Sequence, residues 1–120
     1  MPDERDQRAV LDTVESWARA WLDKGCSVAH GWQHTDRVRR HALVLARAEE
    51  VDPFLAELAA LLHDVGRSQP GPENEHGARS EALAAPFLAG LPLDDQEREA
   101  VLHAVRWHNS GRADSPLLCI

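Results

Sequence analysis

The sequence predicts an all-α protein, a bundle of about five to six helices in a single domain over residues 1–120. Apolar residues recur at helical spacing in five segments, and prolines or glycines separate several of them. No segment reads convincingly as a strand. A hydrophobic content of 43% and a charged content of 28% are ordinary for a globular domain of this length.

The first two helices are each predicted from an apolar stripe. The first is expected from about residue 3 to 24, where Gly25 ends it. The second is expected from about residue 35 to 50. Their inward positions, at spacings of three, four and seven, are Val10, Val14, Trp17 and Trp21 in the first and Val38, Ala42, Leu45 and Ala46 in the second.

The third helix is predicted to be buried on most of its circumference, because Glu57 is its only polar residue from residue 54 to 62. Asp52 and Pro53 supply an N-cap and an N1 proline, and Gly66 supplies the C-terminal stop. The doublet His63-Asp64 is therefore expected in the last turn, where a buried helix opens toward a cleft.

Two further helices follow a loop over residues 67–74. The fourth is expected from about residue 75 to 89, with Pro86 kinking it or restarting it as a short turn. The fifth opens at Asp94 or Asp95. Ser115-Pro116 looks like one more helix start, but only residues 117–120 remain after it. We therefore expect the given sequence to stop short of the domain's natural end, or to finish in a disordered tail.

Charge and composition narrow the classes of partner. A net charge of −7 and a pI near 5.4 argue against a general nucleic-acid binder, whose affinity comes largely from neutralising phosphates. Cys26 and Cys119 fit neither a disulfide framework nor a cysteine-based zinc site. Because no signal peptide or 18-residue apolar run is present, we expect a cytoplasmic protein without membrane contact. The sequence does not give the oligomeric state.

Histidines lie on inward positions near the ends of several helices. Burying an imidazole beside a carboxylate is costly unless something neutralises them, and a divalent cation does so. The best constellation is His34, His63 and Asp64, with His76 and His108 as a second group. Imidazole and carboxylate together suit manganese, iron, cobalt, nickel, magnesium or zinc, as one ion or two. The alternative for each histidine is a core side chain bonded to a carbonyl, and for the doublet a surface pair in a frayed turn.

Two spaced elements resemble a known family. His34-Thr35-Asp36-Arg37-Val38, followed by Leu62-His63-Asp64-Val65-Gly66-Arg67, resembles the HD-domain superfamily of metal-dependent phosphohydrolases. His76-Gly77 and His108-Asn109-Ser110-Gly111 look like the two further histidines of its binuclear members. The resemblance covers about residues 28 to 120.

The resemblance implies a role for each matching residue. His34, His63 and Asp64 would bind a first metal, and Asp64 would bridge to a second metal held by His76 and His108. His30 matches a histidine that lines the site in one branch, and Arg67 and Arg37 would face substrate phosphate. The alternative for Arg37 is a buried salt bridge that fixes the second helix.

This sequence departs from the family pattern near its end. The pattern closes with a further aspartate on a helix beyond the His108 region. The late carboxylate in the given sequence is Asp114, which precedes the helix start at Ser115-Pro116 and is a poor substitute. We therefore expect the last metal-binding aspartate to be missing from the given sequence.

The implied activity is hydrolysis of a phosphate ester, in a nucleotide or another small phosphorylated metabolite, by a metal-activated hydroxide. Asp64 and Arg67 would be the catalytic residues. Two functional alternatives stay open: a di-iron oxygenase with the same ligands, and a non-catalytic module that binds a nucleotide or a partner protein. A further alternative is a helical bundle in which the histidines are structural.

Overall fold

The structure, a computed structural model, describes residues 4–24 and 31–108, and the regular secondary structure within these ranges is all helical. The all-α prediction is confirmed. The helices are α1 (Glu4–Leu22), α2 (Trp32–Ala48), α3 (Pro53–Leu62), α4 (His76–Ala89) and α5 (Asp95–Trp107), with short 3-10 helices η2 (Val65–Ser68) and η3 (Glu73–Glu75).

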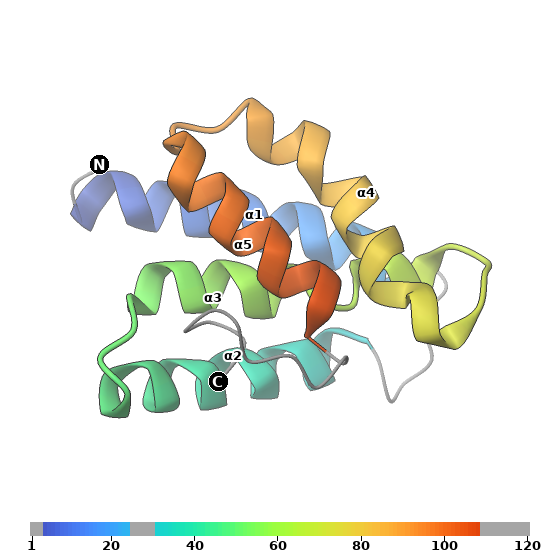
Figure 1. Ribbon diagram of the computed structural model, residues 1–120, viewed down its shortest axis with the longest axis horizontal. Helices are drawn as coiled ribbons and strands as arrows, with labels where there is room; N and C mark the ends of the chain where they lie inside the picture. The colour runs from blue at the N-terminus through green and yellow to red at the C-terminus, as the bar shows by residue number, and fades with distance from the viewer. Residues whose placement is uncertain (1–3, 25–30, 109–120) are drawn as a thin grey trace.

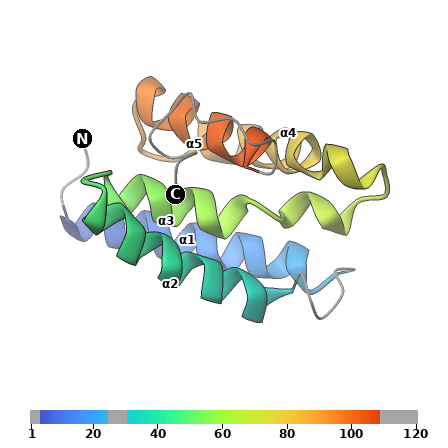
Figure 2. The same ribbon diagram turned by 60° about the horizontal axis from the view of Figure 1, so that its bottom comes forward.

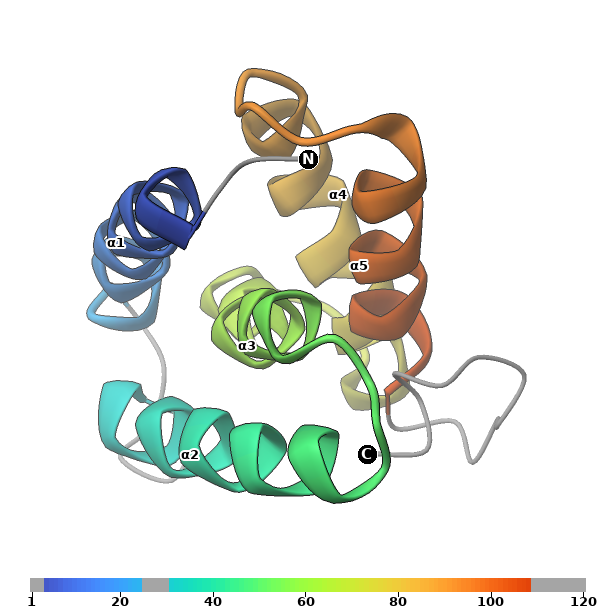
Figure 3. The ribbon, with the colours of Figure 1, turned by 90° about the vertical axis from the view of Figure 1, so that its left-hand side faces the viewer.

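Helix α3 lies at the centre of the bundle. Figure 3 looks nearly along its axis and shows α1, α2 and the pair α4–α5 arranged around it. Helices α1, α2 and α5 each pack directly on α3, while α4 packs on α5 and on η2 (Figures 1 and 2). None of the described helices is both long and apolar enough to cross a bilayer.

The sequence of α3 explains its central place. Asp52 caps the helix by accepting a hydrogen bond from the Phe54 N–H, and Pro53 occupies the first turn. Leu58, Leu61 and Leu62 are fully buried. The one polar side chain, Glu57, is also buried.

An arginine from α2 compensates the burial of Glu57. The Arg39 guanidinium lies 3.2 Å from the Glu57 carboxylate and also pairs with Asp36 in its own helix. A buried carboxylate requires such a partner, so this ion pair orients α2 against α3.

The predicted stop at Gly66 is wrong. Helix α3 ends at Leu62, with His63 as its C-cap, and Gly66 belongs to η2. A Cβ on Gly66 would lie 2.3 Å from the backbone nitrogen of Ser80. Glycine is therefore required here because η2 and α4 approach so closely, and not because the helix ends in a left-handed residue.

Of the two alternatives predicted for Pro86, the restart is wrong, because α4 runs without interruption to Ala89. The kink stays a prediction. An interior proline removes one helical hydrogen bond and crowds the carbonyl four residues earlier, so the helix needs support from packing at this turn. The turn around it is held by buried Ala84 and Leu88 and by Phe87, whose ring stacks on Trp17 at 4.3 Å between centroids.

The turn from α4 to α5 is closed by hydrogen bonds. Asp94 and Glu97 form a reciprocal capping box at the start of α5. Arg98 donates to the carbonyl oxygens of Leu88, Leu91 and Leu93, which satisfies the backbone of the connecting segment. The helix start predicted at Asp94 or Asp95 is confirmed.

Helix α2 begins three residues earlier than predicted, at Trp32, so His34 lies within its first turn. Ala42 and Ala46 are buried as expected, but Leu45 is 41% exposed. The prediction of an inward Leu45 is wrong, because this side chain lies at the edge of a cavity instead of in the core. His30, Asp114 and the Ser115-Pro116 element lie outside the described residues.

Candidate metal centre

Four separate segments bring the predicted ligands together. His34 comes from the first turn of α2, His63 and Asp64 from the end of α3, His76 from the start of α4, and His108 from the end of α5. The rings of His34 and His63 have centroids 5.7 Å apart, those of His63 and His108 5.1 Å, and those of His76 and His108 4.8 Å.

Asp64 is the centre of this arrangement. Its Oδ2 lies 3.2 Å from His63 Nε2 and 3.5 Å from His34 Nε2. Its Oδ1 lies 3.5 Å from His76 Nε2 and 3.9 Å from His108 Nε2. The carboxylate therefore divides the histidines into two pairs, which we call the Oδ2 half (His34, His63) and the Oδ1 half (His76, His108).

Three of the histidines are oriented by the same local contact. The Nδ1 atoms of His63, His76 and His108 lie 2.6 to 2.8 Å from the carbonyl oxygens of Ala60, Glu73 and Val105, each three residues earlier. A carbonyl only accepts, so each Nδ1 carries the proton and donates it. When such a ring is neutral, its Nε2 holds the lone pair and faces the centre, as in metal-binding histidines.

The position of these histidines explains the contact. Each one follows the last turn of a helix: His63 caps α3, His76 caps η3, and His108 caps α5. The last carbonyls of a helix have no N–H partner within it, and the imidazole supplies one.

Electrostatics keep the central carboxylate ionised. Asp64 is almost fully buried, and burial alone would raise its pKa. The contacts of His63 and Arg67 with the carboxylate outweigh burial and hold the pKa of Asp64 well below its usual range. An ionised carboxylate is the form that ligates a cation.

His108 is held in its neutral form. Burial lowers its pKa to about 4, and the neighbouring His63 and His76 contribute in the same direction. The hydrogen bond to Val105 and the charge of Asp64 oppose this shift without reversing it. At neutral pH the Nε2 of His108 is therefore unprotonated, which is a condition for ligating a metal.

Arg67 lies against the Oδ1 half. Its Nε is 3.1 Å from Asp64 Oδ1, and its Nη2 is 3.4 Å from His76 Nε2. The guanidinium also pairs with Glu73, whose carboxylate is exposed. Arg67 is therefore a cation in direct contact with the candidate ligands.

Arg37 is exposed on α2 and takes part in no ion pair within the described residues. The interpretation of Arg37 as a buried salt bridge is wrong, since Arg39 makes that contact with Glu57. The interpretation of Arg37 as a phosphate contact stays a prediction. The same holds for His30, which lies outside the described residues.

Sequence reasoning missed Ser80. Its hydroxyl is fully buried, donates to the His63 carbonyl at 3.0 Å and accepts from the Gly66 N–H at 2.8 Å. Ser80 therefore fixes the backbone on both sides of Asp64 from the neighbouring helix. A serine one turn after His76 was the available signal, but only the pairing of α4 with η2 gives it this role.

The residues present fit a divalent metal centre. Two sets of possible ligands, His34 with His63 and Asp64, and His76 with His108 and Asp64, each have their ligand atoms within 4.8 Å of one another. Two imidazoles and one oxygen of the shared carboxylate per set are a donor combination suited to first-row divalent cations.

A family model described as HD domain matches residues 31–119. No curated protein and no solved structure matches the chain. The matched range contains the five candidate ligands and most of the chain. The protein therefore belongs to the HD-domain family, a superfamily of metal-dependent hydrolases.

Proposed function

We propose that the protein is a metal-dependent phosphohydrolase that cleaves a phosphate ester of a nucleotide or another small metabolite. The observation that carries the proposal is the shared carboxylate: Asp64 presents one oxygen to each pair of imidazoles. His34, His63 and Asp64 would hold one divalent ion, and Asp64, His76 and His108 a second. Such ions supply Lewis acidity and lower the pKa of water toward neutrality.

The residues of the chain would contribute position and charge. The three Nδ1–carbonyl hydrogen bonds keep the imidazoles aimed at the centre before any ligand arrives. Arg67, and Arg37 from α2, would pair with phosphate oxygens and offset the negative charge that accumulates on them during attack by water. Asp64 is ionised at neutral pH and would not compete with substrate for a proton.

The test is hydrolysis of phosphomonoesters and phosphodiesters by the purified chain, supplied in turn with manganese, iron, cobalt, nickel, magnesium and zinc. We expect at least one metal to support turnover. His63→Ala and Asp64→Ala should abolish it. His103→Ala is the matched control, because His103 lies on α5 but in neither candidate ligand set.

Three outcomes would contradict the proposal. Turnover that survives chelation, or that is unaffected by Asp64→Ala, would place the activity elsewhere or in a contaminant. If none of the metals in the series supports turnover, the protein is not a phosphohydrolase. Iron content accompanied by oxygen uptake, without phosphate release, would identify an oxygenase instead.

A further inference from the structure

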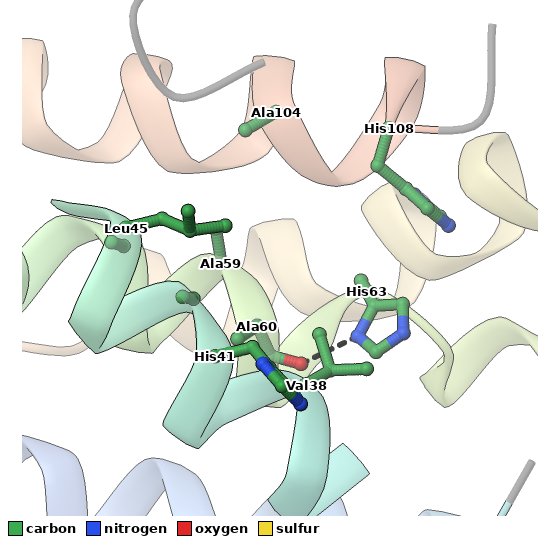
Figure 4. A pocket seen from close by; sticks show the side chains of 10 residues that line it. Val38, His41, Leu45, Ala59, Ala60, His63, Ala104 and His108 are labelled. Carbon is green, nitrogen blue, oxygen red and sulfur yellow. Dashed lines mark hydrogen bonds between the residues drawn. The ribbon is translucent and has the colours of Figure 1, made fainter. Parts of the chain in front are cut away.

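A cavity of about 330 Å³ adjoins the candidate metal centre. It lies between α2, α3 and α5, and Figure 4 shows the side chains that line it. His63 and His108 belong both to this lining and to the candidate ligand sets, one from each half. The cavity is therefore continuous with the site where a phosphate would be attacked.

The packing of the helices explains why this space is not filled. Helices α2 and α5 each pack on α3 but scarcely contact one another within the described residues. The walls between them carry methyl groups instead of larger side chains, from Ala42 on α2, Ala59 and Ala60 on α3, and Ala104 on α5. Alanines at facing positions leave a void that leucines would close.

The chemistry of the lining selects what can enter. Apart from three histidines, every described residue that lines the cavity is aliphatic, and none of these lining residues is a lysine or arginine. Leu45, a large apolar side chain that is 41% exposed, lies at its edge. A charged or heavily hydroxylated group would lose more hydration here than three imidazoles can replace, whereas an apolar ring would lose little.

We infer that the cavity binds the leaving group of the substrate, and that this group is an uncharged ring or similar apolar body. The inference rests on the proposed phosphohydrolase function. In the reaction the oxygen of water forms a bond to phosphorus, the ester P–O bond breaks, and the leaving oxygen takes the proton that water gives up. The product that remains in the cavity is then a neutral apolar alcohol.

The experiment compares benzyl phosphate with ethyl phosphate, two monoesters of primary alcohols that differ mainly in the size of the apolar group. We expect the wild-type kcat/KM for benzyl phosphate to exceed that for ethyl phosphate by about tenfold or more, because apolar pockets discriminate on this scale. Ala59→Leu should remove the preference, because it should lower kcat/KM for benzyl phosphate more than for ethyl phosphate. Ala59 is partly exposed, so leucine can extend into the cavity.

Two variants complete the design. Ala20→Leu makes the same change on the exposed face of α1 and should keep the benzyl preference. Leu45→Glu places a carboxylate at the edge of the cavity without enlarging any buried residue, and should also reduce the preference. A preference that survives in both Ala59→Leu and Leu45→Glu overturns the inference.

A binding measurement supplies a readout that does not depend on turnover. Ligand-observed NMR should detect benzyl alcohol on the wild-type chain and not on Ala59→Leu. If benzyl alcohol binds only after Leu117, Leu118 and Ile120 are replaced by serine, these side chains are the occupant and the inference is overturned. Equal kcat/KM values for the two esters would overturn this inference and leave the proposed function standing. If neither ester is hydrolysed with any metal, the proposed function is overturned as well.

Discussion

The two halves of the candidate metal centre differ in how accessible they are and in what already contacts them. In the Oδ2 half the His34 side chain is 31% exposed, and it comes from the first turn of α2. In the Oδ1 half the His76 side chain is 3% exposed and Arg67 contacts both the carboxylate and the imidazole. A cation that enters the Oδ1 half has to displace a guanidinium, so the two halves should fill with different affinities.

The largest expected effect is the loss of both halves together. Asp64→Asn removes the charge of the only carboxylate in either candidate ligand set. We expect the metal content of the variant, measured by elemental analysis after loading and desalting, to fall to background. Asp12→Asn, on the exposed face of α1, should retain the wild-type content. Retention of one equivalent by Asp64→Asn would show that the halves do not share this carboxylate.

The next largest effect is the loss of metal binding in one half of the centre. His34→Ala should abolish one equivalent of metal and His76→Ala the other, because each removes an imidazole from a different set. When the metal-free variants are titrated with the metal in a calorimeter, each should show one class of metal sites, whereas the wild type should show two. If both variants lose all metal, the two halves act as a single site.

An effect on stability is expected from His108 in the metal-free protein. Its pKa is about 4 in the folded state and near 6.5 when unfolded, so the unfolded chain binds the extra proton. Stability should therefore fall as the pH decreases from about 6.5 to 4, by up to about 3 kcal/mol, and the contribution of this group is constant below that range.

Urea unfolding in the presence of a chelator measures this dependence. His108→Gln, which has no titratable group at the position, should show a shallower decline between pH 6.5 and 4. A decline as steep as that of the wild type would assign the proton uptake to other groups.

The smallest expected effect concerns Arg67. Arg67→Ala removes the cation beside Oδ1 and should strengthen metal binding in the Oδ1 half while weakening the use of phosphate substrates. Loss of a hydrogen bond to a charged group predicts an increase of about tenfold or more in KM for the phosphate ester. Arg67→Lys should give intermediate values. Unchanged kinetics in Arg67→Ala would remove this residue from substrate binding.

Much of the fold could be predicted from local sequence. Asp52-Pro53 and Asp94 with Glu97 specify two helix starts through caps that involve neighbours in the chain only. The errors fell where distant segments decide the outcome. The local pattern predicts a helix stop at Gly66, although the role of this residue comes from the approach of Ser80, fourteen residues away.

The candidate site also combines features that the sequence predicts with features that depend on distant segments. The two ligand sets, His34 with His63 and Asp64, and His76 with His108 and Asp64, were predicted from inward positions and from a family resemblance, and the structure brings their ligand atoms together. Arg37 and Arg39 are two residues apart in one helix, and spacing alone could not say which of them reaches Glu57. Leu45 was misplaced because an apolar stripe does not reveal whether it faces a packed core or a cavity.

The carbonyl contacts of His63, His76 and His108 have a practical consequence. Each ring takes its orientation from its own helix end, within three residues along the chain. The ligands are thus arranged by the polypeptide and not by the ion. A chelator should remove any bound metal while the bundle stays folded, and cobalt or another spectroscopically visible ion should enter the same positions afterwards.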